Sequence, residues 1–177
     1  MAVLTVLIAP HPILSTKTEP VATVDKEVIQ QLHDMAETMY EDRGIGLAAN
    51  QVGILKRMVV MDVGDDNSLT EKAHPIDPKL FYFVNPVVEW ESDETVVFEE
   101  SCLSVPDQSI PVERPISIRL RYFDEGGTER IEDFHGLQAR CIQHELDHIN
   151  GKTVLEYLSK LKKELAVKKL TKHYLAK

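Results

Sequence analysis

Cysteine is scarce in this sequence, with only Cys102 and Cys141 in 177 residues. Two cysteines without a secretory segment do not make the disulfide framework of a small extracellular protein. Long hydrophobic runs are also missing, and no stretch approaches the length needed to span a bilayer. Repeats, low-complexity tracts and linkers rich in proline, glycine or serine are absent as well. We therefore expect a single domain over residues 1–177, in the cytoplasm, as a monomer with no membrane or DNA partner.

The formal net charge of −9 is unevenly distributed along the chain. Residues 160–177 contain seven lysines and one acidic residue, Glu164, so this segment is strongly basic and the remainder strongly acidic. A basic terminal helix on an acidic body favours contact with RNA or another polyanion. A solvated helix that begins near Ser159 and turns Leu161, Leu165 and Leu170 inward explains the same pattern without a partner.

Hydrophobic periodicity indicates a mixture of helices and strands. Apolar residues recur at helical spacing from Val24 to Tyr40. Compact or alternating apolar runs predict strands over residues 58–63, 81–88, 116–122 and 130–134. The fold expected is α+β, with antiparallel sheets around a central helix and with a further helix at the C-terminus.

The central helix is expected within residues 136–151, where His144, Glu145 and His148 form an H-E-x-x-H pattern. Two histidines four residues apart lie on one face of a helix and can hold one divalent metal. The Glu145 carboxylate could then reach a metal-bound water without being a ligand, which is the arrangement of metal-assisted hydrolysis. A buried histidine pair on an ordinary amphipathic helix is the alternative interpretation.

A glycine-rich segment, residues 44–49, matches the pattern G-x-G-x-x-A of dinucleotide-binding proteins. That fingerprint requires a preceding strand and a following helix. A helix precedes the segment here, so we reject nucleotide binding. The small residues permit close approach or tight packing, and the nearby Gln51 offers an amide donor suited to an oxyanion.

A catalytic metal site needs a third protein ligand and an open position. A metzincin-like site fails because Val154 stands where a third histidine is required. A thermolysin-like site would need a downstream glutamate such as Glu156 or Glu164. Cys102 is the better candidate, because it ends an extended run from which a side chain could project into a site. We interpret Cys141 as a small buried hydrophobe.

Three separated segments resemble the signature motifs of one family, the peptide deformylases. They are residues 44–51 (GIGLAANQ), residues 100–104 (ESCLS) and residues 144–148 (HELDH), and they occur in the family's order. The resemblance covers nearly the whole chain. It implies removal of the formyl group from the N-terminal formyl-methionine of newly made polypeptides, with release of formate.

The resemblance also implies a role for each motif residue. Cys102, His144 and His148 would be the metal ligands, with water in the fourth position. Fe²⁺ would be the native metal, with Zn²⁺, Ni²⁺ or Co²⁺ as substitutes. Glu145 would accept a proton from the water and later deliver one to the leaving amine.

Other roles implied by the resemblance concern the substrate. The Gln51 side chain and the Leu103 backbone N–H would stabilise the oxyanion, and the backbone of Ile45 and Gly46 would pair with the peptide. The positions that correspond to the methionine pocket are Ile45, Leu137, Arg140, Cys141 and His144. The basic C-terminal helix would fit contact with the ribosome, since the substrates are nascent chains.

Three residues depart from the family pattern. Ser101 stands where glycine is usual, Ser109 where many members have arginine, and Arg140 where an apolar pocket residue is common. Serine at position 101 would be strained if the backbone there needed a positive φ.

Two readings from other classes remain open at this stage. In a zinc endopeptidase that uses the two histidines and a glutamate, Cys102→Ser would leave metal affinity unchanged. In a catalytically silent domain with a closed structural metal, Glu145→Ala would not affect any activity.

Overall fold

The computed structural model describes residues 2–64 and 79–175 of the chain. The helices are α1 (Lys26–Glu41), α2 (Gly136–Ile149) and α3 (Lys160–Leu170), with short helical turns η1 (Pro12–Ser15), η2 (Ala49–Val52), η3 (Val154–Tyr157) and η4 (Thr171–Leu175). The strands are β1 (Gly46–Ala48), β2 (Met58–Met61), β3 (Phe81–Glu91), β4 (Thr95–Cys102), β5 (Val105–Pro115), β6 (Ser117–Phe123) and β7 (Glu129–His135). The predicted α+β class is confirmed, and the expected strand runs match β2, β3, β6 and β7.

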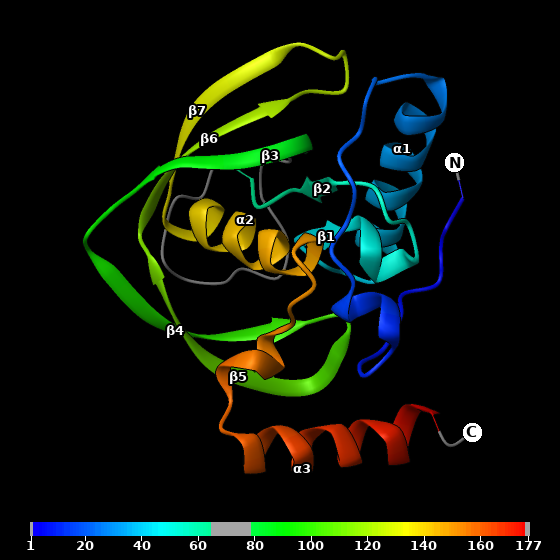
Figure 1. Cartoon of the computed structure of the whole chain (residues 1–177), viewed down its shortest axis with the longest axis vertical. Helices are drawn as coiled ribbons and strands as arrows, with labels where there is room; N and C mark the ends of the chain where they lie inside the picture. The colour runs from blue at the N-terminus through cyan, green and yellow to red at the C-terminus, as the bar shows by residue number, and fades with distance from the viewer. Residues whose placement is uncertain (1, 65–78, 176–177) are drawn as a thin grey trace.

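Two antiparallel sheets enclose α2. Five strands form the larger sheet in the order β1-β2-β3-β6-β7, and β4 pairs with β5 in the smaller one. Figure 1 shows α2 between them, with the larger sheet on one side and the β4–β5 hairpin on the other. Every residue of α2 except Asp147 is buried, so this helix lies at the centre of the molecule.

Strand alternation explains how the larger sheet faces α2. Ile118, Leu120 and Tyr122 of β6 are buried, whereas Arg119 between them is exposed. Period-two side chains of a strand point to opposite faces, so the apolar set forms the wall that packs on α2. Phe134 of β7 joins the same apolar cluster.

Helix α2 begins and ends at glycines with positive φ. Gly136 has φ 55° and follows β7 directly, while Gly151 has φ 79° just beyond Asn150, which caps the helix. A Cβ at Gly151 would lie 2.8 Å from the carbonyl oxygen of Ser15. Glycine is therefore required at this exit by both conformation and space. The helix therefore lies within the residues expected for it, 136–151.

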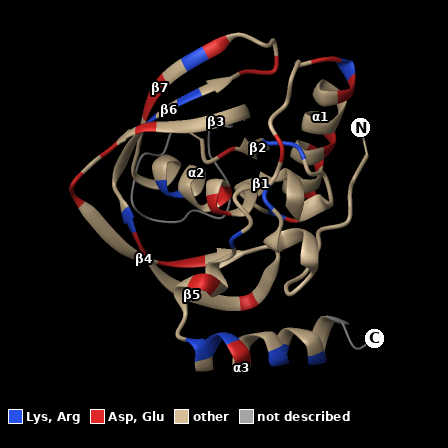
Figure 2. Cartoon of the chain, in the orientation of Figure 1, with Lys and Arg blue, Asp and Glu red and all other residues tan. Residues whose placement is uncertain are grey.

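The C-terminal helix differs from its predicted orientation. Ser159 caps α3 and Leu170 is buried, as expected, but Leu161 and Leu165 are 67% and 56% exposed. Ala166 shares the buried side with Leu170. The prediction that Leu161 and Leu165 face inward is wrong, because α3 packs through the opposite side of the helix. Figure 2 shows the basic residues of α3 along the outside of the molecule.

Candidate active site

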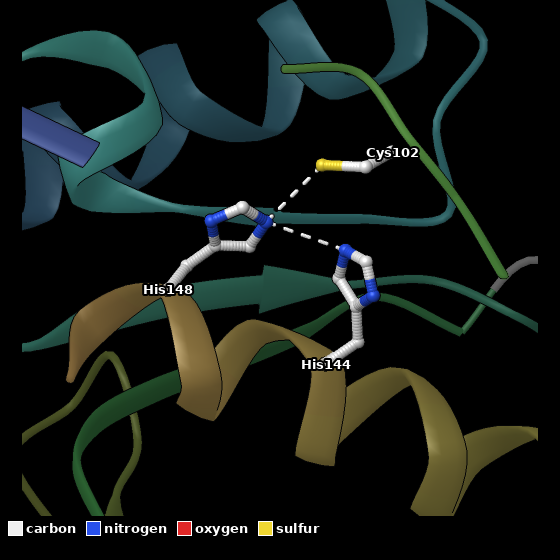
Figure 3. Close-up of side chains that lie close together, drawn as sticks. All are labelled: Cys102, His144 and His148. Carbon is white, nitrogen blue, oxygen red and sulfur yellow. Dashed lines mark hydrogen bonds between the residues drawn. The ribbon is translucent and has the colours of Figure 1, made fainter. Parts of the chain in front are cut away.

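Three side chains predicted as metal ligands converge on one point, as Figure 3 shows. Helix α2 presents His144 and His148 one turn apart, and Cys102 arrives from the end of β4. The Cys102 Sγ lies 3.2 Å from His148 Nε2, which lies 3.3 Å from His144 Nε2. A β-bulge between Glu100 and Cys102 shifts the register of the hairpin at the point where the sulfur turns inward.

The donor set fits a four-coordinate transition metal. Tetrahedral bonds of about 2.0–2.3 Å place neighbouring N and S donors roughly 3.3–3.6 Å apart. The observed separations match this spacing within a few tenths of an ångström. One thiolate and two imidazoles suit Zn²⁺ and Fe²⁺, whereas Mg²⁺ and Ca²⁺ prefer oxygen. The three protein donors leave one tetrahedral position for another ligand.

Glu145 lies beside these donors but is not one of them. Its side chain is buried, and Oε2 has no hydrogen-bond partner within the described protein. Gly46 of β1 faces it so closely that a Cβ there would lie 2.7 Å from Glu145 Oε1. Burial raises the pKa of Glu145 to about 7. An unpartnered carboxylate of this kind is well suited to accept a proton.

Gln51 reaches the site from η2. Its side-chain oxygen accepts from the Ala48 backbone N–H, and its Nε2 donates to Ser104 Oγ at 3.1 Å and toward Cys102 Sγ at 3.7 Å. The amide nitrogen therefore points to the metal-ligand side. Leu103 lines the same cavity. The structure thus places both residues that were predicted to supply oxyanion donors beside the same cavity.

A buried ion-pair network behind His144 was not predicted from the sequence. The Arg114 guanidinium of β5 donates to Glu100 through Nε at 2.6 Å and Nη2 at 2.9 Å. Glu100 Oε2 lies 2.9 Å from His144 Nδ1. Arg114 Nη1 contacts Asp147 at 3.0 Å and the Tyr157 hydroxyl at 3.3 Å. A charged residue in the alternation Ile110, Val112, Arg114 was the available signal.

The pKa shifts follow from this arrangement. Burial opposes ionisation of Glu100, but its bonds to Arg114 and His144 lower its pKa to about 2. Burial and the nearby His144 lower the pKa of His148 well below its ordinary value, whereas burial opposes ionisation of His144 but its bonds to Cys102 and Glu100 raise its pKa. Burial, with the nearby Glu145 carboxylate, raises the pKa of the Cys141 thiol. Cys141 therefore remains protonated, as expected of a buried hydrophobe.

A cavity of about 420 Å³ opens onto Cys102 and His144. It is lined by Arg43, Gly44, Ile45, Gly46, Gln51, Glu100, Ser101, Cys102, Leu103, Leu137, Arg140, Cys141, His144 and Glu145. Every residue predicted for the methionine pocket therefore lines one space. The guanidinium of Arg140 lies 4.7 Å from the ring centroid of Phe98, so this side chain packs against an aromatic ring at the wall.

Of the two serines that depart from the family pattern, Ser101 lines the cavity and Ser109 does not. Ser101 is exposed at the cavity and is not among the residues with positive φ, so serine causes no backbone strain there. Ser109 is exposed on β5 and does not line the cavity. The concern that Ser101 strains the backbone beside Cys102 is removed.

Comparison with known proteins gives consistent matches over nearly the full chain. The family model for polypeptide deformylase matches residues 3–164. A peptide deformylase of Phenylobacterium zucineum is 46% identical over 173 residues, covering 98% of both proteins. The crystal structure of an Ehrlichia chaffeensis peptide deformylase in complex with actinonin superposes with a TM-score of 0.90 at 38% identity, covering 98% of this chain and 99% of that one.

A second crystal structure, of a peptide deformylase from Legionella pneumophila, has a TM-score of 0.84 at 35% identity and covers 97% of this chain and 95% of its own. No helix in the described residues is both long and apolar enough to cross a membrane. The family model spans most of the chain and the relatives are 35–46% identical to it, so the zinc endopeptidase and the catalytically silent domain are both set aside. The chain belongs to the polypeptide deformylase family, the metal-dependent hydrolases that remove the N-terminal formyl group from newly made polypeptides.

Proposed function

We propose that Cys102, His144 and His148 bind the catalytic metal and that Fe²⁺ is the native ion. The observation that carries the proposal is the convergence of one sulfur and two imidazole nitrogens, all within 4.8 Å of one another. A thiolate makes the site soft enough for ferrous iron as well as zinc, so Zn²⁺, Ni²⁺ and Co²⁺ are expected substitutes. When bound, the metal supplies Lewis acidity, which polarises the formyl carbonyl and lowers the pKa of water.

Glu145 acts as the general base and then the general acid. Its unpartnered Oε2 accepts a proton from the attacking water, and the same oxygen delivers a proton to the leaving amide nitrogen. Bond cleavage then releases formate and a free N-terminal amine. Burial by β1 keeps the carboxylate out of bulk water, which supports a pKa near the working pH.

Gln51 and Leu103 stabilise the negative charge that develops on the formyl oxygen. Gln51 is pre-oriented because the Ala48 backbone N–H holds its side-chain oxygen. The amide nitrogen is thereby held on the metal-ligand side, where it can exchange its long 3.7 Å contact with Cys102 Sγ for a hydrogen bond to the oxyanion. The Leu103 backbone N–H is the second donor. Ile45, Gly46, Leu137, Arg140 and Cys141 surround the methionine side chain and the first peptide unit.

Formate release from formyl-Met-Ala-Ser by anaerobically purified, iron-loaded protein tests these assignments. Glu145→Ala is expected to lose about 10²–10⁴ in kcat while retaining its iron. Glu99→Ala, which removes an exposed glutamate of the same hairpin, is the control and should match the wild type. Equal activity of Glu145→Ala and the control would refute the role of Glu145. Copurification of another metal after anaerobic isolation would refute iron as the native ion.

The exposed lysines of α3 are proposed to contact ribosomal RNA, which would bring the enzyme to its nascent-chain substrates. Lys168 and Lys169 are exposed on α3, which packs through Ala166 and Leu170, and Lys172 is exposed on the η4 turn that follows it. Deleting α3 would uncover that apolar contact, so charge reversal is the cleaner perturbation. The triple Lys→Glu variant should lose cosedimentation with ribosomes at low salt but keep its peptide activity. Unchanged cosedimentation would exclude this surface.

A cytoplasmic, monomeric, single-domain enzyme completes the proposal. One chain supplies the whole proposed site: Gln51, Cys102, Leu103, His144 and Glu145 line one cavity, and His148 Nε2 lies 3.2 Å from Cys102 Sγ, so a second copy is not needed to build it. Light scattering after size exclusion should give the mass of one 20.1 kDa chain. A dimer mass would contradict the monomer, and recovery of the enzyme in a membrane or periplasmic fraction would contradict the location.

A further inference from the structure

We propose that Tyr157 and Asp147 are positioning residues that hold the His144 imidazole through Arg114 and Glu100. Neither residue lines the cavity that contains the metal donors. The inference rests on the proposed role of His144 as a ligand, and it assigns a function to two residues outside the three ligands and the general base.

The connection to His144 begins with the carboxylate of Glu100. Its Oε2 faces His144 Nδ1 at 2.9 Å, which leaves Nε2 of the ring directed to the other donors. Histidine ligands are commonly oriented in this way by a carboxylate on the second ring nitrogen. Oε2 also accepts from Arg114 Nη2, so any rotation of the guanidinium displaces the oxygen that holds the histidine.

Arg114 needs a further restraint because Glu100 fixes only one edge of its planar guanidinium. Nε and Nη2 form the side-on pair with Glu100, and Nη1 remains on the opposite side. Asp147 Oδ2 forms an ion pair with Nη1 at 3.0 Å. Asp147 lies three residues after His144 on α2, so the two side chains are neighbours on the helix surface. The contacts His144–Glu100–Arg114–Asp147 therefore form a closed set that begins and ends on α2.

Tyr157 restrains this closed set of contacts from the solvent side. Its hydroxyl donates to Asp147 Oδ2 at 2.7 Å and accepts from Arg114 Nη1 at 3.3 Å. Its ring centroid lies 5.3 Å from the guanidinium carbon, so the aromatic ring also restrains the plane of Arg114. Burial, followed by the bond to Asp147, raises the pKa of Tyr157, so the hydroxyl remains a donor.

The position of Tyr157 explains why a distant hydroxyl would matter. Arg114 is 5% exposed but Asp147 is 21% exposed, and a cavity of about 250 Å³ on this side is lined by both and by Tyr157. Without the hydroxyl, water could take its place on Asp147 and Nη1 and loosen the geometry. A shift in the Asp147–Arg114–Glu100 contacts would then move the His144 imidazole as well as the local surface.

Tyr157→Phe tests the proposal because it removes the hydroxyl and keeps the ring. Tyr174→Phe is a matched control, since Tyr174 also donates to an aspartate, Asp107, and the two tyrosines are 44% and 40% exposed. We expect Zn²⁺-loaded Tyr157→Phe to lose its metal to EDTA about tenfold faster than the wild type. The visible spectrum of the Co²⁺ form should change, and kcat should fall with KM for formyl-Met-Ala-Ser unchanged. Tyr174→Phe should behave as the wild type throughout.

Asp147→Asn gives a second route to the same answer. The substitution removes the negative charge that Arg114 Nη1 contacts and keeps the shape of the side chain, so it should also accelerate zinc loss. Because both residues act through Arg114, the double variant with Tyr157→Phe should lose zinc no faster than the more affected single variant. The proposal would be overturned if both single variants lost zinc at the wild-type rate and had the wild-type Co²⁺ spectrum. His144→Ala separates the two levels of inference: if it retains zinc, the ligand assignment itself is wrong.

Discussion

Gly46→Ala should disable the enzyme through a single methyl group. The alanine Cβ would lie 2.7 Å from both Glu145 Oε1 and Cys141 Sγ, whereas ordinary contacts begin near 3.4 Å. Both contacts must therefore open by about 0.7 Å. The Cys141 sulfur has little freedom on a buried helix, and the backbone of Gly46 is paired with Met61 of β2. The Glu145 carboxylate, at the end of a flexible side chain, is displaced most easily, while the contact with Cys141 Sγ adds strain.

Displacing a catalytic group by about 1 Å costs on the order of 10² in rate. Gly46→Ala should thus lower kcat for formyl-Met-Ala-Ser by about 10²-fold, while overpacking lowers the free energy of unfolding by about 1–3 kcal/mol. Iron content should be unchanged, because the three atoms nearest to the alanine methyl belong to Cys141 and Glu145 and not to a proposed ligand. Gly126→Ala, where the nearest atom is 3.3 Å away in an exposed turn, is the control. Activity of Gly46→Ala within threefold of that control would refute the reasoning.

Three further predictions concern the residues around Cys102. Glu100→Gln should lower the free energy of unfolding of the metal-free protein by about 3 kcal/mol at pH 7. Because the folded pKa of Glu100 is depressed to about 2, the stability it contributes is complete above its ordinary 4.5 and is lost as the pH falls toward 2, so urea titrations of variant and wild type should converge over that range. Ser101→Gly should change kcat less than twofold and destabilise by about 0.4–1 kcal/mol, since the backbone there is unstrained; a large gain in activity would contradict this. Cys102→Ser should greatly weaken Zn²⁺ binding in a chelator titration, and unchanged affinity would exclude the sulfur as a ligand.

Local sequence patterns predicted most of the architecture. The alternation of Ile118, Leu120 and Tyr122 with exposed neighbours identified β6, because strand periodicity is a property of the segment itself. Helix α2 was predicted from its H-E-x-x-H motif. That the helix is buried on nearly every side was not, because burial depends on two sheets supplied by distant segments.

Long-range pairing was the part that sequence reasoning missed. Leu161 and Leu165 were expected to face inward, but periodicity shows only which residues share a helix face and not which face is covered. Arg114 likewise carries no sign of its partners, because Glu100 and Asp147 meet it only when the hairpin closes on α2. Cys102 was preferred as the third ligand because the metzincin-like and thermolysin-like alternatives fitted poorly, and resemblance to a family then assigned it to the same metal as the two histidines.

The order of the three converging donors along the chain has a consequence for biosynthesis. Cys102 precedes His144 by 42 positions, and His148 lies near the end of α2. Synthesis proceeds from the N-terminus at about 5–20 residues per second, so the thiol emerges seconds before either imidazole and well before the helix can dock between the sheets. A metal captured early would have one protein donor and would be held weakly. Stable loading is therefore a late event in the maturation of each molecule, after α2 has left the ribosomal tunnel and packed.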